Sequence, residues 1–465
     1  MARTLAVIEG LTLFLVVSVL ILGWVQPMVI DWIDVAGVLG QALALSACCI
    51  VAFYYNDLYD LRVVRTFGDF AVRLIQAFGV AFILLAGFYT AFPGTRIADG
   101  VFFSSFLLIF GVLLPIRALS YWVMRSRPFQ ERVLILGSSP LAGQIVAEIA
   151  VRPHLRQRVV GIVPDAPGGP GTPPGYVEFG PMEHLAQIID EVRPDRIVVA
   201  LGERRGRLPV RTLLDARLTG VIIEDGPDAY ERLAGKLAIE ALTPSSLVFS
   251  RDFRKSRVDL LAGRAVSLSL ALLGLPVYLA LYPLIALAIR LDSRGPVLFV
   301  QERIGLNGRR FRLIKFRTMR PDNGSTSEWV RDNRGRVTRV GEILRRYRLD
   351  ELPQLVNMLR GDMNLVGPRP HPVSNQELFR QMIPYYALRS VVRPGMTGWA
   401  QIRYGYANNL EEETEKMRYD LYYIKHLSFW RDLRILIDTV KTIMFGRGAQ
   451  ATDAYVTESR PVPSR

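Results

Sequence analysis

The sequence predicts a membrane α-helical bundle, then an α/β Rossmann-like domain, then a mostly α monotopic domain with a re-entrant membrane helix. Three observations carry this prediction. Apolar runs gather in the first 125 residues, a strand–helix–strand pattern follows them, and a further apolar run near residue 265 has basic residues on both sides. With 465 residues, the chain is too long for one ordinary domain.

Composition sets limits on the class of protein. Hydrophobic residues make up 50% of the chain, and the mean hydropathy of +0.22 requires them to be segregated from the charges. The formal charge of +14 indicates an anionic partner, either lipid, a phosphorylated substrate or nucleic acid. No recognised nucleic-acid-binding module accompanies the charge, so we expect no nucleic-acid partner. Cys48 and Cys49 are adjacent in an apolar run, which suggests neither a disulfide nor a metal site.

Residues 1–125 are predicted to form a four-helix transmembrane bundle. Apolar runs cover roughly 5–25, 35–55, 71–92 and 101–123, and no small-residue cleavage site follows the first. Basic residues gather at one set of helix ends, at Arg62, Arg65, Arg73, Arg117, Arg125 and Arg127. By the positive-inside rule both ends of the bundle lie in the cytoplasm, so everything after residue 125 begins there.

Residues 130–245 are predicted to form a degenerate Rossmann-like domain. Short buried strands at 132–136, 159–163 and 196–201 alternate with helical patterns, as in a parallel βαβ sheet. The dinucleotide fingerprint is degraded, because Ser139 and Ala142 stand where its second and third glycines would fall after Gly137. A structural or regulatory sheet is therefore favoured over a nucleotide site.

An uncharged run at about 265–290 is long enough to span a membrane, but its flanks argue against a crossing. Both flanks are basic, and a spanning helix would leave one of them outside. Pro276 and Pro283 interrupt the run, which suits a helix that bends and returns to the same face. We therefore predict a re-entrant helix in the inner leaflet; the alternative is an ordinary kinked spanning helix.

The segment after this run is strongly basic. Between Arg303 and Arg348 there are fourteen Lys or Arg and four acidic residues, a net charge of +10. Such a patch beside a membrane helix would bind anionic headgroups of inner-membrane lipid and attract polyanionic substrates. A later segment, 429–445, is amphipathic and fits either the membrane surface or a core.

Asp350 and Glu351 follow a run of arginines and open a helical pattern that ends at Gly361. Asp350 is expected at or near the N-cap, with Pro353 in the first turn. A carboxylate held ionised beside arginines can attack phosphorus, and its neighbour can hold a cation. Taken alone, the pair favours a helix cap with a surface ion pair.

Six phrases in one order resemble the bacterial sugar transferase family, the monotopic polyprenyl-phosphate sugar-1-phosphate transferases. The resemblance covers about residues 251–447. The phrases are Gln301–Gly305, Lys315–Met319, Leu349–Gln354, Gly361–Met363 with Gly367–Pro370, Arg393–Gln401, and Tyr419–Lys425. The whole layout is similar to the large subgroup with four N-terminal membrane helices, such as undecaprenyl-phosphate galactose or glucose phosphotransferases. In one place the chain departs from the family, because neither Pro276 nor Pro283 follows the serine at which the re-entrant helix commonly bends.

The resemblance implies a reaction in which a UDP-sugar, with glucose or galactose expected, donates its sugar 1-phosphate to undecaprenyl phosphate and releases UMP. It would be the first membrane step of exopolysaccharide or O-antigen (lipopolysaccharide) synthesis. Residues 251–447 would be the transferase domain, 448–465 a loosely ordered tail, and the protein a multi-pass component of the bacterial cytoplasmic (inner) membrane. Four extra helices are compatible with a homodimer, although the sequence leaves the oligomeric state open.

The resemblance also implies roles for particular residues. Asp350 would attack phosphorus to form a phosphosugar-enzyme intermediate, and Glu351 would bind Mg2+. Phosphates and nucleotide would be held by Arg345, Arg369, Lys315 and Arg317, with Asp420 as an orienting acid. Without the family, Lys315 and Arg317 fit lipid headgroup contacts equally well, and Asp420 fits a structural hydrogen-bond acceptor.

Two other functions remain open from the sequence. The first is a non-catalytic scaffold of a polysaccharide assembly complex, which would not need Arg345, Asp350, Glu351 and Arg369 together. The second is an oxidoreductase or epimerase that uses the Rossmann-like domain. It is disfavoured by the missing glycines.

Overall fold

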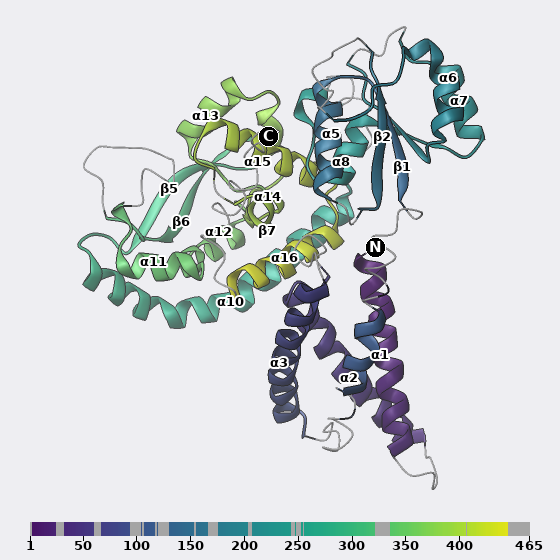
Figure 1. The fold of residues 1–465 in the computed structure, drawn as a ribbon. Coiled ribbons are helices and arrows are strands. Elements are labelled where there is room, and N and C mark those ends of the chain that lie inside the picture. The colour runs from purple at the N-terminus through teal and green to yellow at the C-terminus, as the bar shows by residue number, and fades with distance from the viewer. Residues whose placement is uncertain are drawn as a thin grey trace. The chain divides into compact units, whose positions relative to one another are not determined.

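The computed structural model divides the chain into two compact units, residues 1–224 and 225–465, whose elements Figure 1 shows. The predicted domain boundaries at 125, 245 and 447 stay a prediction. The structure describes residues 2–24, 32–59, 67–93, 104, 107–116, 119, 130–152, 155–165, 175–202, 207–242, 247, 253, 255–320, 335–405 and 407–444.

The first unit begins with apolar helices. Helices α1 (Ala2–Trp24), α2 (Trp32–Tyr55) and α3 (Phe67–Ala91) confirm the helices predicted from the first three apolar runs, and residues 107–116 are helical within the fourth. Apolar side chains such as Leu45, Phe53 and Leu74 fill most of their shared core, and Glu9 on α1 is buried as well, at 1% exposed. Among the described residues, two segments are long and apolar enough to cross a membrane, Phe70–Ala91 and Arg257–Asp292.

Most of the charges that predicted the bundle's orientation lie outside the described residues. These are Arg62, Arg65, Arg117, Arg125 and Arg127, and the predicted tail 448–465 also lies outside. Arg73 is described and donates from Nη1 to the main-chain oxygen of Asn56 over 3.2 Å. The orientation of the bundle therefore stays a prediction.

The first unit also contains a four-stranded sheet in the order β2-β1-β3-β4, in which β1 pairs in parallel with both β2 and β3. Alternate β1 residues, Leu134 and Leu136, pack into a core with α6 and α7, and α5 lies on the opposite face (Figure 1). The elements are β1 (Glu131–Leu136), α5 (Pro140–Val151), β2 (Gln157–Val163), α6 (Leu185–Val192), β3 (Arg196–Val199), α7 (Val210–Leu218) and β4 (Ile222–Asp225).

The turn after β1 is held by the protein's own carboxylate. Gly137 has φ +108°, and a Cβ there would lie 2.4 Å from the main-chain oxygen of Ala200. Ser138 donates to Asp165 from both its main-chain N, over 2.9 Å, and its Oγ, over 2.6 Å. Where a dinucleotide fingerprint would present amides to phosphate, one amide of this turn already has an internal partner.

The second unit is mostly helical. Its helices are α8 (Gly226–Ala234), α10 (Arg257–Asp292), α11 (Arg339–Arg346), α12 (Gln354–Arg360), α13 (Val373–Met382), α14 (Trp399–Arg403), α15 (Leu410–Lys425) and α16 (Phe429–Met444). Its strands are β5 (Leu298–Ile304), β6 (Arg310–Phe316), β7 (Asn364–Val366) and β8 (Gly395–Thr397), and short 3-10 turns lie at Ile239–Ala241, Leu306–Gly308, Leu349–Glu351 and Tyr386–Val391. The antiparallel β5–β6 hairpin was not among the sequence predictions.

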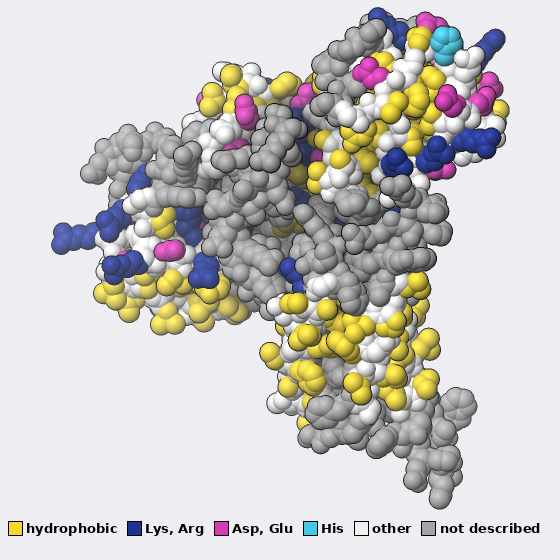
Figure 2. Space-filling view, in the orientation of Figure 1, with side chains coloured by type: hydrophobic (Ala, Val, Ile, Leu, Met, Phe, Trp, Pro, Cys, Tyr) yellow, Lys and Arg dark blue, Asp and Glu magenta, His cyan; other side chains and the backbone are white. Residues whose placement is uncertain are grey.

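Helix α10 is the longest element, with 36 residues, and its helical assignment continues through Pro276 and Pro283. One side packs against α11, α12 and β7, with Ala271, Tyr278 and Ile289 buried. The other side exposes a row of large apolar side chains, visible along the lower edge of this unit in Figure 2. A bend that returns the chain to the same membrane face stays a prediction.

Candidate active site

Asp350 and Glu351 lie in a single 3-10 turn, Leu349–Glu351, and not at the cap of the following helix. Asp350 is therefore near a helix start, as expected, but it is not the cap: Arg348 is the N-cap of the 3-10 turn, and Pro353, expected in the first turn, is the N-cap of α12 (Gln354–Arg360). Pro353 has no N–H to donate back to Leu349, so Leu352 N bonds the oxygen of Leu349 instead, over 3.2 Å. In this tight turn both carboxylate side chains are buried.

Asp350 is 9% exposed. Burial, followed by the charge of Glu351, raises the pKa of Asp350 to about 6, against the lowering effect of Lys315, Arg369 and Arg345. The group is therefore ionised at neutral pH yet poorly solvated. A carboxylate in this condition is a competent nucleophile toward phosphorus.

Glu351 is 3% exposed and is paired with two arginines. Its Oε1 accepts from Arg369 Nη1 over 3.0 Å, and both of its oxygens lie 3.5 Å from Arg348 Nη1. Burial works to raise the pKa of Glu351, but the charges of Arg369 and Arg348 outweigh it and lower that pKa. The pKa of Asp350 is thus raised and the pKa of Glu351 is lowered, which separates the chemical roles of the two carboxylates.

Lys315 lies on β6, and its Nζ is 5.0 Å from the centroid of the Phe299 ring. Burial, followed by the charge of Arg303, lowers the pKa of Lys315 to about 8, although the charge of Asp350 acts to raise it. Arg345 is half-buried near the end of α11, and its charge acts on both Asp350 and Lys315. The fold therefore brings these two cations to the carboxylate pair.

Arg317 and Asp420 have partners of a different kind. Arg317 is buried, and its guanidinium donates to the main-chain oxygens of Ser293, over 2.8 Å, and of Arg294, where α10 ends. The described hydrogen bonds of Arg317 therefore satisfy main-chain oxygens at the C-terminal end of α10. Asp420 is buried on α15 and accepts from Arg389 Nε over 2.9 Å, within the protein interior.

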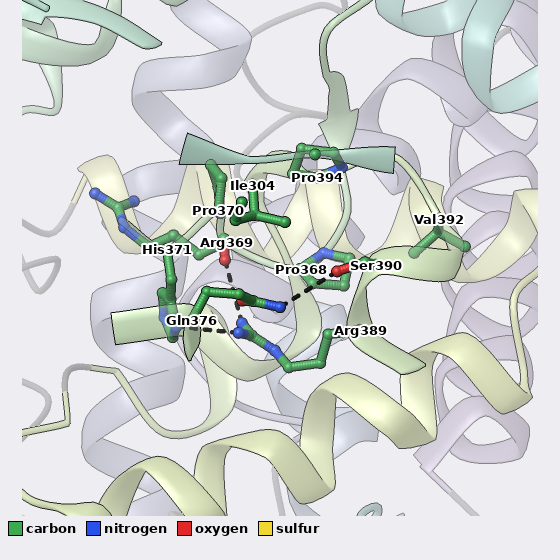
Figure 3. A pocket seen from close by; sticks show the side chains of 11 residues that line it. Ile304, Pro368, Arg369, Pro370, His371, Gln376, Arg389, Ser390, Val392 and Pro394 are labelled. Carbon is green, nitrogen blue, oxygen red and sulfur yellow. Dashed lines mark hydrogen bonds between the residues drawn. The ribbon is translucent and has the colours of Figure 1, made fainter. Parts of the chain in front are cut away.

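The Arg389–Asp420 pair supports the loop that carries Arg369. Arg389 Nη2 donates to the main-chain oxygen of Arg369 over 3.1 Å, and Figure 3 shows this bond between two of the residues that line a small pocket at the Pro368–His371 loop. Arg389 Nη1 also donates to the Tyr386 hydroxyl over 2.6 Å. Asp420 thus acts on Arg369 through Arg389, which is an orienting role at one remove from the carboxylates.

The sequence reasoning missed two residues of this cluster. Arg348 has φ 54°, a left-handed conformation that is unfavourable for arginine and directs its side chain to Glu351. Gln401, on α14, accepts hydrogen bonds from both Arg348 and Arg369. Gln401 ends the phrase Arg393–Gln401, which carries part of the family resemblance. Arg348 belongs to the arginine run just before Asp350, and this position could have identified it from the sequence.

The residues present fit a shared Mg2+ site but not a closed one. Among the described residues no group of three or more His, Cys, Asp or Glu could hold a metal. Mg2+ is usually held through one or two carboxylates together with substrate phosphates, and Asp350 and Glu351 supply two adjacent carboxylates. Arg348 and Arg369 occupy the oxygens of Glu351 in this structure. A Mg2+ site would therefore be completed only when a diphosphate draws these arginines to its own oxygens.

The chain is similar both to a family model and to individual known proteins. Residues 258–446 match the family model described as bacterial sugar transferase. The chain is 35% identical over 328 residues to UDP-glucose:undecaprenyl-phosphate glucose-1-phosphate transferase of Escherichia coli (strain K12), covering 68% of each chain. It is 32% identical over 388 residues to the protein of the same name from Klebsiella pneumoniae, covering 80% of this chain and 82% of that relative.

A third relative is matched over a shorter segment. This is UDP-N-acetylgalactosamine-undecaprenyl-phosphate N-acetylgalactosaminephosphotransferase of Aeromonas hydrophila, 38% identical over 221 residues, which are 47% of this chain and about half, 52%, of that relative. Sequence coverage and identity, together with the carboxylate pair and its arginines in one buried cluster, lead to one conclusion. The chain belongs to the bacterial sugar transferase family.

Proposed function

We propose that this protein transfers a sugar 1-phosphate from a UDP-sugar to undecaprenyl phosphate and releases UMP, as a first membrane step of exopolysaccharide or O-antigen synthesis. The observation that carries the proposal is the buried Asp350, ionisable near neutral pH and surrounded by the charges of Arg345, Arg369 and Lys315. The names of the Escherichia coli and Klebsiella relatives support the lipid acceptor and a UDP-glucose donor.

The reaction proceeds in two displacements. A carboxylate oxygen of Asp350 attacks the phosphorus that bears the sugar, and the bond from that phosphorus to the bridging oxygen breaks, so that UMP leaves with the oxygen. A phosphate oxygen of the lipid then attacks the same phosphorus and releases Asp350. The arginines and Lys315 stabilise the charge that spreads over the phosphoryl oxygens in each step.

Glu351 would hold Mg2+, which when bound would neutralise charge on the diphosphate. Arg369 would exchange its bond to Glu351 for one to a phosphate oxygen, where the guanidinium geometry suits paired acceptors. Lys315, with a pKa of about 8, is largely protonated at neutral pH and supplies a further positive charge.

Helix α10 is proposed to lie within one leaflet of the membrane and not to cross it. The unit holds α10 from end to end: Arg264 Nη1 donates to Met363 O over 3.1 Å, Leu365 N donates to Ser267 Oγ over 3.0 Å, and Val340 N donates to Asp292 Oδ2 over 2.8 Å. A crossing helix would draw these polar attachments into hydrocarbon. Its exposed apolar side, with Leu273 72% exposed, would face the lipid.

The exposed half of α16 would share this lipid face. Trp430 is 73% exposed, whereas Ile435 on the same helix is fully buried. Of the two alternatives left open by the sequence, core packing therefore holds for one side of the helix, and the exposed side would lie on the membrane surface.

Turnover is tested with purified full-length protein, undecaprenyl phosphate and a panel of UDP-sugars, by measuring UMP. We expect one UDP-sugar to stand out and Asp350→Asn to abolish release. Asp432→Asn is the matched control, because burial also raises the pKa of Asp432 to about 6 but this residue pairs with Tyr423. Near-normal turnover by Asp350→Asn would refute the covalent mechanism.

Leaflet placement is tested by labelling Leu260→Cys and Val300→Cys in a background where Cys48 and Cys49 are replaced by Ala. Both cysteines should react only from the cytoplasmic side. Labelling of either one from the periplasmic side would refute the proposed arrangement.

A further inference from the structure

Gln401 links the two arginines that neutralise Glu351. Its Oε1 accepts a hydrogen bond from Arg348 Nη1 over 3.3 Å and from Arg369 Nη1 over 3.2 Å. The same two Nη1 atoms reach Glu351 over 3.5 Å and 3.0 Å. One amide oxygen and one carboxylate therefore share a pair of guanidinium groups that come from separate loops.

The orientation of the Gln401 amide follows from its neighbours. Turned the other way, its NH2 group would face two cationic donors, so the oxygen must point to the arginines. Gln401 is 8% exposed, and among the described residues its Nε2 has no hydrogen-bond partner. An unpaired buried donor destabilises the fold, so folding stability alone does not account for a glutamine at this position.

The chemical type of the acceptor matters. A neutral oxygen holds two guanidinium groups near each other without competing with Glu351 for their charge. A carboxylate at the same position would draw both arginines toward itself. An apolar side chain would leave them free to separate, and the Arg348 contact with Glu351, at 3.5 Å, is already long.

The backbone around Gln401 is tightly held. A Cβ on Gly398 would lie 2.2 Å from the main-chain oxygen of Gly367, so α14 approaches the loop that leads to Arg369 closely. The next residue, Trp399, donates from Nε1 to the main-chain oxygen of Gly235 over 2.9 Å. The contacts with Gly367 and Gly235 therefore fix the position of α14, the helix from which Gln401 projects.

We propose that Gln401 is a positioning residue that holds Arg348 and Arg369 together on Glu351, so that both guanidinium groups are in place when the diphosphate arrives. The inference rests on the proposed function and adds a residue for which no role was assigned. Gln401 does not touch the reacting atoms; it acts through the arginines.

Two substitutions test it in the full-length protein. Gln401→Met keeps the volume but removes the acceptor, and Gln401→Glu keeps the acceptor but adds a charge. Gln376→Met is the matched control, because Gln376 is half-buried in the same unit and donates to Ser390 Oγ over 3.4 Å. UMP release is measured as kcat and KM for the UDP-sugar, and the amount of folded protein is measured in parallel.

We expect Gln401→Met to lower kcat roughly 10- to 100-fold, as when a supporting group is lost from a preorganised site. Gln401→Glu should lower kcat by a similar factor, because its charge draws both arginines away from Glu351, while KM for the UDP-sugar changes little in either variant. A residue that served folding alone would reduce the amount of folded protein and leave kcat per folded molecule unchanged. Wild-type kcat per folded molecule in Gln401→Met or in Gln401→Glu overturns the proposal.

A second readout keeps this proposal separate from the proposed function. If the wild-type protein released no UMP with any UDP-sugar, the proposed function would fail. The positioning role would still be measured by the affinity of the purified protein for inorganic pyrophosphate, a diphosphate without the sugar, which Gln401→Met should weaken several-fold and Gln376→Met should not. Equal affinity in Gln401→Met and the wild-type protein would then overturn the inference about Gln401.

Discussion

Replacing Asp350 by Asn should abolish turnover and at the same time stabilise the fold at alkaline pH. Burial and the charge of Glu351 raise the pKa of Asp350 from 3.8 to about 6. A group whose pKa is raised in the folded state stabilises the protein below its unfolded pKa, and that contribution is lost as the pH rises through the folded value. Above about pH 6 the wild-type protein therefore carries a cost that the Asn variant avoids.

The size of the effect follows from the shift. About two pKa units at 1.36 kcal/mol each correspond to about 3 kcal/mol at pH values well above 6. For a unit of this size, that is an increase in Tm of roughly 6–12 °C. Because Glu351 is present in both proteins, its opposite pH dependence largely cancels in the difference between them.

The assay is thermal unfolding of the purified proteins at about pH 8 and about pH 4, with Asp432→Asn measured in parallel. The Tm advantage of Asp350→Asn should be large at the higher pH and close to zero at the lower pH. Activity of the wild-type protein should fall on the acid side near pH 6, as Asp350 becomes protonated. A variant that is less stable at pH 8, or equally stabilised at both pH values, would refute this account of the site.

Three further outcomes are expected. Arg369→Lys should reduce kcat/KM roughly 100-fold, because lysine cannot reproduce the guanidinium contacts to Glu351 and phosphate, measured by UMP release. Asp420→Asn should destabilise the second unit by roughly 3–5 kcal/mol, since it leaves the buried charge of Arg389 without its partner, measured by denaturant unfolding. Leu237→Ala should cost roughly 2–5 kcal/mol in the same measurement, because Leu237 is fully buried in the core around α15.

Matched controls separate these outcomes from general damage. Asp438→Asn removes a partly exposed acid 3.9 Å from Arg434 and should cost less than about 1 kcal/mol. Leu378→Ala removes a half-exposed leucine and should be nearly neutral. Equal losses in a control and in its partner variant would contradict the burial argument.

The core around α15 also shows a limit of reading domains from sequence. Leu237 and Ile239 belong to a segment that the sequence assigns to the Rossmann-like domain, yet both pack in the core of the second unit. Glu231 on α8 similarly pairs with Lys425 on α15 over 2.9 Å. Apolar periodicity does not say which neighbouring core an apolar residue will join.

By itself the sequence determined the apolar helices, the strands of the parallel sheet, the family and the carboxylate pair with most of its cations. These follow from local patterns: apolar periodicity, proline and glycine signals, and phrases whose residues are close together in the chain. Only the tertiary structure decided that Asp350 lies in a 3-10 turn, that Arg317 closes the end of α10, and that Gln401 bridges Arg348 and Arg369. The physical reason is that burial, charge compensation and hydrogen-bond partners depend on residues distant in sequence, and packing alone brings those residues together.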